Sequence, residues 1–119
     1  MVYTSGTLSL AAMELLVHVD PDLEPPDLVA LSAEIPDALT VHVVSLEELP
    51  SGWRRYPAPR PLQQLGWRWA KAATTAVLSV PSAVIPSERN YLLNPLHPEF
   101  RRIRIGKPRA FRFDPRLWK

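Results

Sequence analysis

The chain has 119 residues, 46% hydrophobic and 22% charged, a balance typical of one globular domain and unlike that of a disordered segment. Its net charge of +2 combines an acidic first half, with nine Asp or Glu and no Lys or Arg up to residue 51, and a basic end at residues 101–119. The absence of cysteine excludes disulfide frameworks, Cys-containing zinc sites and thiol catalysis, and no apolar run or signal region indicates a membrane. We therefore predict a single cytoplasmic domain over residues 1–119.

The first elements predicted are a strand and a helix. The run VYTS at residues 2–5 is typical of a strand, and a helix is predicted over residues 7–19, starting near Thr7. On a helical wheel, one narrow stripe carries Glu14 and His18, and nearly every position outside this stripe is apolar. This pattern predicts a helix that is buried over most of its circumference.

The middle of the chain is predicted to contain two strands and a second helix. Residues 28–36 and residues 41–45 have strand-like patterns, and a proline-containing turn between them predicts a hairpin. Pro61 suits the first turn of a helix over residues 61–74, which carries an apolar stripe.

The last third is predicted to hold a central strand, a long loop and two further strands. Residues 75–82 are almost continuously apolar, as expected at the centre of a sheet. Residues 81–100 contain four prolines and two asparagines, and they are predicted to form a structured functional loop, since ordinary connections have about four to six residues. Strands are predicted at residues 102–107 and 110–114. Helices and strands interleave without a strict βαβ rhythm, which favours an α+β domain with a mixed, mainly antiparallel sheet and two main helices.

The basic end of the chain has two interpretations. Residues 101–119 hold eight basic side chains and a single acid, Asp114. Such a cluster can mark a surface for nucleic acid or an acidic partner, or it can pair with acids of the same chain.

Three side chains near the start of the chain are candidates for a site. Glu14, in the middle of an otherwise apolar helix, faces either solvent or a cleft, and both readings stay open. His18 lies one turn further on. It could line a pocket with Glu14, or it could stabilise the end of the helix through a favourable interaction with the helix dipole. Tyr3, on the preceding strand, is a core candidate whose hydroxyl needs a partner.

Polar side chains of residues 81–100 form a second group of candidates. Ser82 directly follows the predicted central strand, where it could project into a cleft or complete a turn. Asn90 and Asn94 suit Asx turns that tie the loop to itself. The three histidines share no metal-ligand spacing, and the phosphate-loop, nucleophile-elbow and zinc-protease motifs are absent, so we predict no metal site.

Three runs of the sequence resemble the RES-domain family of bacterial toxins: VYTSGTLSLAAMELLVH near the start, VPSAVIPSERNYLLNPLHPEF in the last third and FRFDPRLW at the end. They occur in family order over essentially the whole chain. The resemblance implies an ADP-ribosyltransferase-like fold, an enzyme that consumes NAD+, and neutralisation by an Xre-like antitoxin. It leaves open whether water, phosphate or a protein accepts the ADP-ribose.

The resemblance also implies site residues. Tyr3 matches the family's strand tyrosine in the NAD+ pocket, Glu14 its helix glutamate, Ser82 the serine of its VPSA segment, and Asn90 an asparagine expected to be structural or adjacent to the pocket. Glu14 is the implied catalytic residue, because a carboxylate beside the ribose can stabilise an oxocarbenium-like state or orient the attacking group. The implied NAD+-binding set is Tyr3, Ser82 and Asn90.

One departure from the family pattern concerns the phosphates of NAD+. Family members usually carry an arginine-containing segment before the first strand, and we expect this chain to lack it, so that Arg54, Arg89, Arg101 or another downstream residue substitutes. The alternative is a non-catalytic or incomplete RES scaffold that serves as a binding module for an antitoxin or DNA. For a catalytic toxin we expect contact with nucleic acid only through the antitoxin, and no contact with a membrane. Whether the toxin forms a homo-oligomer within the complex stays open.

Overall fold

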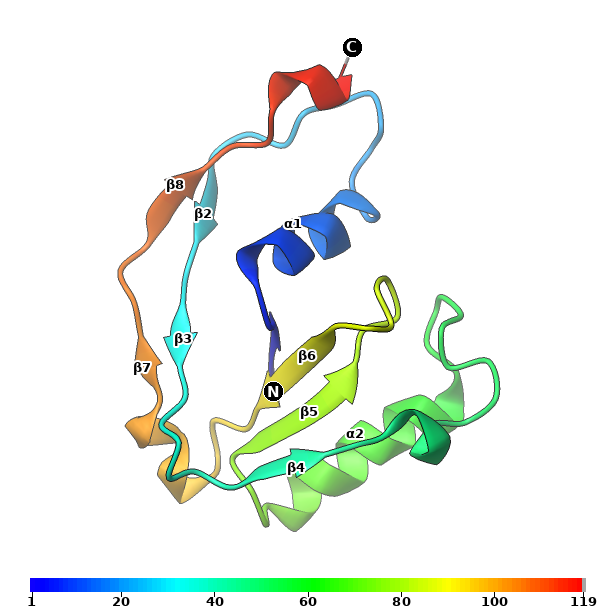
Figure 1. Ribbon diagram of the computed structural model, residues 1–119, viewed down its shortest axis with the longest axis vertical. Helices are drawn as coiled ribbons and strands as arrows, with labels where there is room; N and C mark the ends of the chain where they lie inside the picture. Colours follow the sequence, from blue (N-terminus) through cyan, green and yellow to red (C-terminus); the bar gives the residue numbers. More distant parts are fainter. Residues whose placement is uncertain (119) are drawn as a thin grey trace.

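The computed structural model describes residues 1–118; Lys119, the last residue of the basic end, lies outside the described part. The described residues form two α-helices and eight short strands (Figure 1). In chain order they are β1 (Val2–Ser5), α1 (Leu8–Leu16), β2 (Leu28–Ala30), β3 (Ala33–Glu34), β4 (Val41–Val43), α2 (Arg60–Ala72), β5 (Val77–Pro81), β6 (Arg89–Leu93), β7 (Arg104–Ile105) and β8 (Arg109–Phe111). Short 3₁₀ turns lie at Leu46–Glu48, Pro98–Arg102 and Pro115–Trp118. This composition confirms the predicted α+β class.

Four strands form the main sheet, in the order β1-β6-β5-β4. Strand β6 is antiparallel to both β1 and β5, whereas β4 runs parallel to β5. Four of the five residues of β5 are buried, as its continuous apolar sequence predicts for a central strand. Strands β1 and β4 are the two edges of this sheet.

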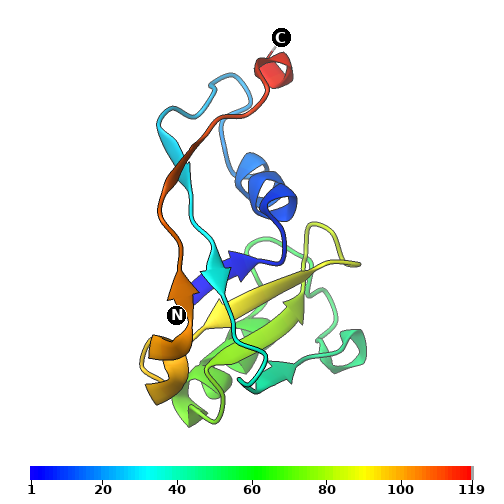
Figure 2. The same cartoon turned by 60° about the vertical axis from the view of Figure 1, so that its left-hand side comes forward.

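The remaining strands form an arm, which consists of β2 paired with β8 and β3 paired with β7, both antiparallel. The arm rises from one end of the main sheet and carries the C-terminus at its far end (Figure 2). Near that end, Arg112 Nε lies 2.9 Å from Glu24 Oε1. The radius of gyration is 15.5 Å, against about 13.5 Å for a compact domain of this length. The arm accounts for this extended shape.

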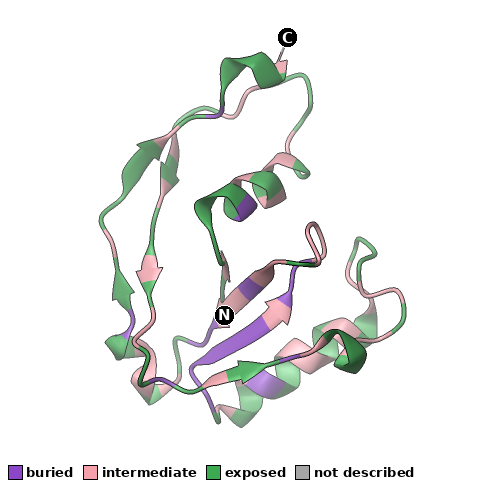
Figure 3. Cartoon of the chain, in the orientation of Figure 1, coloured by how far each residue is buried: buried purple, intermediate pink, exposed green. Residues whose placement is uncertain are grey.

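The two faces of the main sheet bury separate apolar clusters. On one face, Trp69 of α2 packs with Leu78 of β5. On the other, Val77 and Leu93 pack with Ile103, which follows the second 3₁₀ turn. Strand β5 serves both clusters because successive side chains of a strand point to opposite faces. Strand β5 is accordingly buried along most of its length, whereas β6 has buried residues only at Asn90 and Leu93 (Figure 3).

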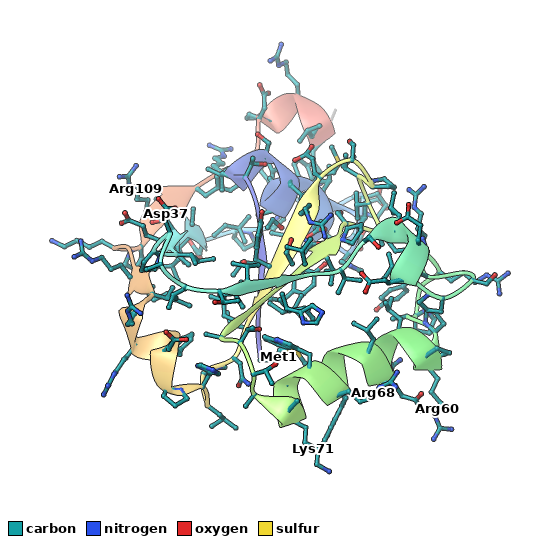
Figure 4. All side chains as sticks on the ribbon, turned by 60° about the horizontal axis from the view of Figure 1, so that its bottom comes forward. Met1, Asp37, Arg60, Arg68, Lys71 and Arg109 are labelled. Atoms are coloured by element: carbon teal, nitrogen blue, oxygen red, sulfur yellow. The ribbon has the colours of Figure 1, made fainter. Side chains whose placement is uncertain are left out.

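Helix α2 is divided into an apolar side and a basic side. Trp69 is buried against the sheet, and Leu65, one turn before it, packs on the same cluster. Arg60 and Lys71 are exposed and point away from the sheet into solvent (Figure 4). The apolar stripe predicted for this helix therefore faces the core, as expected for a helix that covers one face of a sheet.

Several basic side chains of the C-terminal end are paired within the chain. The ion pairs, with N–O distances of 3.2, 2.9 and 2.7 Å respectively, are Arg102–Glu99, Arg112–Glu24 and Arg116–Asp114. All three arginines are exposed, so each pair adds little to stability. Pairing within the chain, one of the two interpretations of this basic segment, is confirmed for these three residues.

Helix α1 is more exposed than its apolar sequence predicts. Its start is as expected, because the Thr7 side chain caps it by accepting a hydrogen bond from Leu10 N at 3.1 Å. Leu10 is buried, but Leu8 is 56% exposed and Met13 41% exposed. The predicted burial over most of the circumference is therefore wrong. The helix packs along β1, and no segment within residues 1–118 covers its outer side.

Two further predictions from the sequence are wrong. Residues 28–36 and 41–45 do not form a hairpin, because the first segment pairs with the C-terminal strands of the arm and β4 pairs with β5. Residues 81–100 are not one loop, because they contain β6, which pairs with strands on both sides. In both segments, pairing with distant strands outweighs a local turn signal, which comes from Pro36 and Asp37 in the first segment and from prolines and asparagines in the second.

A buried hydrogen bond after α2 offers a direct stability test. Trp69 Nε1 donates to Thr75 Oγ1 at 2.9 Å, and Thr75 Oγ1 donates to the Val77 carbonyl at 2.9 Å. Thr75→Val leaves the indole N–H without a partner, so we expect the free energy of unfolding in urea to fall by about 1–3 kcal/mol. The matched control is Thr74→Val at the adjacent exposed position, expected to change it by less than about 0.5 kcal/mol. Equal effects of the two substitutions would contradict this role of Thr75.

Candidate active site

One face of the main sheet brings polar side chains of β1 and β6 together. In the antiparallel register, Ser5 lies opposite Asn90, and Tyr3 lies opposite Leu92. Strand β5 adds Val80, which also lies opposite Asn90. Because alternate residues of a strand share a face, this side of the sheet combines a polar end, from Ser5 and Asn90, with an apolar floor.

Helix α1 places the carboxylate of Glu14 against this polar end. Its Oε2 accepts hydrogen bonds from Ser5 Oγ and Asn90 Nδ2, both at 2.9 Å. Its Oε1 accepts from Ser82 Oγ at 2.8 Å. The donors come from β1, from β6 and from the residue after β5, so three parts of the sheet converge on one anion and hold it in place.

Asn90 is the centre of this hydrogen-bond cluster. Its side chain is fully buried, and its amide oxygen accepts from the Tyr3 hydroxyl at 2.7 Å. Its amide nitrogen also reaches the Thr4 carbonyl, at 3.3 Å. The predicted Asx turn at Asn90 is therefore wrong, because the residue lies in a paired strand and its side chain binds β1 and α1. Asn94 does form the predicted turn, accepting from Leu96 N at 3.1 Å.

Ser82 is fully buried immediately after β5. Its hydroxyl oxygen accepts hydrogen bonds from Val84 N and Ile85 N, both at 3.1 Å, while it donates to Glu14. A serine hydroxyl has one donor and two acceptor positions, so all three are occupied. Ser82 thus connects the turn after β5 rigidly to the carboxylate.

The cluster lies in the wall of a cavity of about 880 Å³. Tyr3, Ser5 and Glu14 line it on one side, and Leu62 and Leu65 of α2 line it on another. Most of the other lining side chains are apolar. A cavity of this size is large enough for a ligand of drug or nucleotide size, and the carboxylate supplies a charged group at a defined point of its wall.

Comparison with known proteins adds to this geometry. A family model described as the RES domain matches residues 1–114 of the chain. The chain belongs to the RES-domain family. The resemblance seen in the sequence is thereby confirmed.

Relatives of this RES domain carry toxin names. It is 35% identical over 119 residues to the "Prs ADP-ribosylating toxin" of Sphingobium sp., with 98% of this chain and 74% of that protein covered. It is 33% identical over 117 residues to the "Toxin Res" of Yersinia enterocolitica, with 98% and 76% covered. It is 36% identical over 120 residues to the "Toxin Res" of Pseudomonas putida, with 99% and 79% covered.

The RES domain holds all four site residues predicted from its sequence in one hydrogen-bonded cluster. Glu14 binds Ser82 and Asn90, and Asn90 binds Tyr3. Their functional roles stay predictions. The sequence also made Tyr3 a candidate for the core, and this prediction is wrong. Tyr3 is 61% exposed, because β1 is an edge strand. Ser5 was not predicted; the signal for it is its spacing of two residues from Tyr3, which places both on one face of β1.

The arginines expected near phosphate groups lie in different places. Arg54 lines the cavity, whereas Arg89 and Arg101 do not. Arg89 directly precedes Asn90 on β6 and so lies on the opposite face of the sheet. There its Nε donates to Ser79 Oγ at 2.6 Å and a terminal nitrogen donates to the Val44 carbonyl. Of the three arginines, Arg54 alone is therefore positioned at the site.

Two further properties concern residues 1–118 as a whole. No group of three or more His, Asp or Glu side chains among them is arranged to hold a metal ion. His97 instead caps the second 3₁₀ turn, where its Nδ1 accepts from Glu99 N at 3.0 Å. The same residues include no helix with the length and apolarity needed to cross a bilayer.

The Tyr3 hydroxyl has an altered acidity that can be measured. Although much of the Tyr3 side chain is exposed, its hydroxyl end is partly buried against Asn90, and this burial and, secondly, the charge of Glu14 raise the pKa of Tyr3 to about 12. The pKa of tyrosine in an unfolded chain is about 10. The neutral Tyr3 hydroxyl therefore contributes fully to the stability of the folded state below about pH 10. This contribution is lost as the pH rises through about 12. In an absorbance titration of tyrosinate, Tyr3→Phe should remove a component near pH 12, and Tyr56→Phe should leave it. Loss of a component near pH 10 instead would contradict the assignment.

Proposed function

We propose that this RES domain is an NAD+-consuming toxin that cleaves the bond between nicotinamide and ribose. The single observation that carries the proposal is the Glu14 carboxylate, held by three donors in the wall of a cavity large enough for a dinucleotide. The name of the Sphingobium relative, an ADP-ribosylating toxin, supports the same chemistry. NAD+ is the ADP-ribose donor in such reactions.

The proposed reaction needs an anion at this point. As the bond between C1′ of the ribose and the nicotinamide nitrogen breaks, its electron pair leaves with nicotinamide, which becomes neutral. The ribose is left with oxocarbenium character, and the fixed negative charge of Glu14 stabilises it. An oxygen of the acceptor then attacks C1′ and releases its proton to solvent, which completes the transfer of ADP-ribose.

Hydrogen-bond capacity assigns a different task to each residue of the cluster. A carboxylate has about four acceptor positions, and three donors occupy Glu14, so one position is left for a substrate hydroxyl or an attacking water. Ser82 has no free position and Asn90 is fully buried, so both act by positioning Glu14. The exposed ring of Tyr3 is the surface on which the nicotinamide stacks.

The test is to incubate the chain with NAD+ and to measure nicotinamide release and the second product. Water as acceptor yields free ADP-ribose, phosphate yields its phosphorylated form, and a protein acceptor yields a labelled protein band when radiolabelled NAD+ is used. Any one of these three products, formed together with nicotinamide, supports the proposal, which does not assign the acceptor. A chain that releases no nicotinamide under any of these conditions would overturn the proposal.

We further propose that an Xre-like antitoxin binds and neutralises this toxin in the cytoplasm. Within that complex, the toxin can also form a homo-oligomer. The second candidate function is a non-catalytic module that binds the antitoxin or DNA, and the basic C-terminal end favours it. That alternative predicts no nicotinamide release and a DNA affinity that falls steeply with salt, because phosphate contacts release counterions.

A further inference from the structure

Two consecutive arginines line the same cavity as Glu14. Arg54 and Arg55 belong to the rim segment, which we define as residues 52–57 between the first 3₁₀ turn and α2. No other arginine or lysine among residues 1–118 lines this cavity. Neither arginine lies within ion-pair distance of an acidic side chain of the described chain. Both positive charges are therefore not neutralised by the protein and can act on a ligand.

Arg54 is anchored beside the residue that binds the catalytic carboxylate. Its Nε donates to the Ala83 carbonyl at 2.8 Å, and Ala83 directly follows Ser82, which donates to Glu14. A guanidinium has five N–H donors, and the anchors are two neutral carbonyls, because a terminal nitrogen of Arg54 also donates to the Val84 carbonyl at 3.5 Å. Three donors and the full charge are therefore retained. Glu14 and Arg54 thus bind two consecutive residues of one turn, Ser82 and Ala83 respectively. The two charged side chains do not form an ion pair with each other.

The rim segment is held in place on both of its sides. Gly52 has a φ of +73°, and a Cβ there would lie 3.2 Å from Arg55 Nε, so a glycine lets Arg55 pack closely over the turn. The Tyr56 ring lies 5.1 Å from the ring of His18, just after α1. The segment is therefore tied to the end of α1 by Tyr56 and to the turn after β5 by Arg54.

We propose that Arg54 and Arg55 bind the diphosphate of a dinucleotide whose nicotinamide ribose lies at Glu14. This inference rests on the proposed function and adds the subsite for the phosphates. NAD+ carries positive charge at nicotinamide and negative charge at the diphosphate, and the cavity has the same order of complementary charges, a carboxylate followed by two guanidiniums. Guanidinium groups suit this task because their paired N–H donors match phosphate oxygens.

The test measures binding by calorimetry, so it does not depend on turnover. ADP-ribose carries the diphosphate but no nicotinamide, and nicotinamide riboside carries the reacting bond but no phosphate. Replacing both arginines, Arg54→Gln with Arg55→Gln, should weaken ADP-ribose binding about 10- to 100-fold. Binding of nicotinamide riboside should stay within about twofold. The matched control is Arg60→Gln, an exposed arginine that does not line the cavity and should leave both affinities unchanged (Figure 4).

The outcomes separate this inference from the proposed function. Unchanged ADP-ribose affinity in the double variant overturns the role of the two arginines, even when the chain releases nicotinamide. Arginine-dependent ADP-ribose binding without nicotinamide release supports the subsite and overturns the enzyme. Because Arg54 also anchors the turn that holds Ser82, Arg55→Gln alone is a second variant that leaves this anchor in place. It should weaken ADP-ribose binding with an unchanged unfolding midpoint.

Discussion

Glu14→Gln is expected to lower the rate of nicotinamide release from NAD+ by about 10²- to 10³-fold, the usual effect of removing one well-placed electrostatic group from an active site. Glutamine keeps the size and shape of the side chain but removes its negative charge. The oxocarbenium-like state of the ribose then loses the anion that offsets its charge. Because that anion acts mainly on the transition state, kcat should fall much more than KM rises.

The matched control for this substitution is Glu47→Gln, at an exposed position outside the cavity, which should keep the full rate. The stability of the Glu14→Gln protein must also be measured, because the NH₂ group of its new amide would face Ser5, Asn90 or Ser82, all of which donate to Glu14. Unfolding midpoints of both variants distinguish lost chemistry from lost folding. A Glu14→Gln protein that is folded and releases nicotinamide at the full rate would refute the assigned role.

Leu93→Ala is expected to lower the free energy of unfolding by about 3–5 kcal/mol, at the upper end of what a buried leucine contributes. Leu93 is fully buried at the end of β6, where the register places it opposite Val2 of β1 and Val77 of β5. Its side chain is part of the apolar cluster on the face of the sheet opposite to α2. Truncation removes its contacts and leaves a cavity that neighbouring strands cannot close.

The same chain provides a matched control three residues further on. Leu96 is 91% exposed, so Leu96→Ala makes the same chemical change and should alter stability by less than about 0.5 kcal/mol. Urea denaturation of the two variants measures the difference directly. A loss below about 1 kcal/mol for Leu93→Ala, or equal losses for both, would mean that β6 is not central to the core.

Elements with a strong local pattern were predictable from the sequence. The continuous apolar run of β5 indicated a central strand, and Thr7 and Pro61 marked the starts of the two helices. Strand β6 was missed because RNYLL is short and is flanked by prolines and asparagines, which locally favour turns. What makes it a strand is pairing with β1 and β5. Such pairing depends on residues far apart in the chain, which local propensity does not report.

The candidate site was predictable only in part, for a similar reason. Glu14 stood out as a carboxylate on an apolar helix, and Ser82 as a polar residue directly after a buried strand. Their hydrogen bond joins residues 68 positions apart, and no local pattern indicates it. The prediction of a turn at Asn90 is wrong because no local pattern indicates the strand that contains this residue. The exposure of α1 was missed because apolar composition indicates which residues can be buried, and not whether any segment covers them.

The separation of the site residues along the chain has a consequence for its biosynthesis. Tyr3 and its partner Asn90 are 87 positions apart, and β1 neighbours β6 alone in the main sheet. While a ribosome is still making the segment before residue 90, the first strand has no neighbour and the carboxylate lacks one of its three donors. A cell that translates this gene therefore carries no complete Glu14 hydrogen-bond cluster on its nascent chains until about three quarters of these 119 residues have been joined.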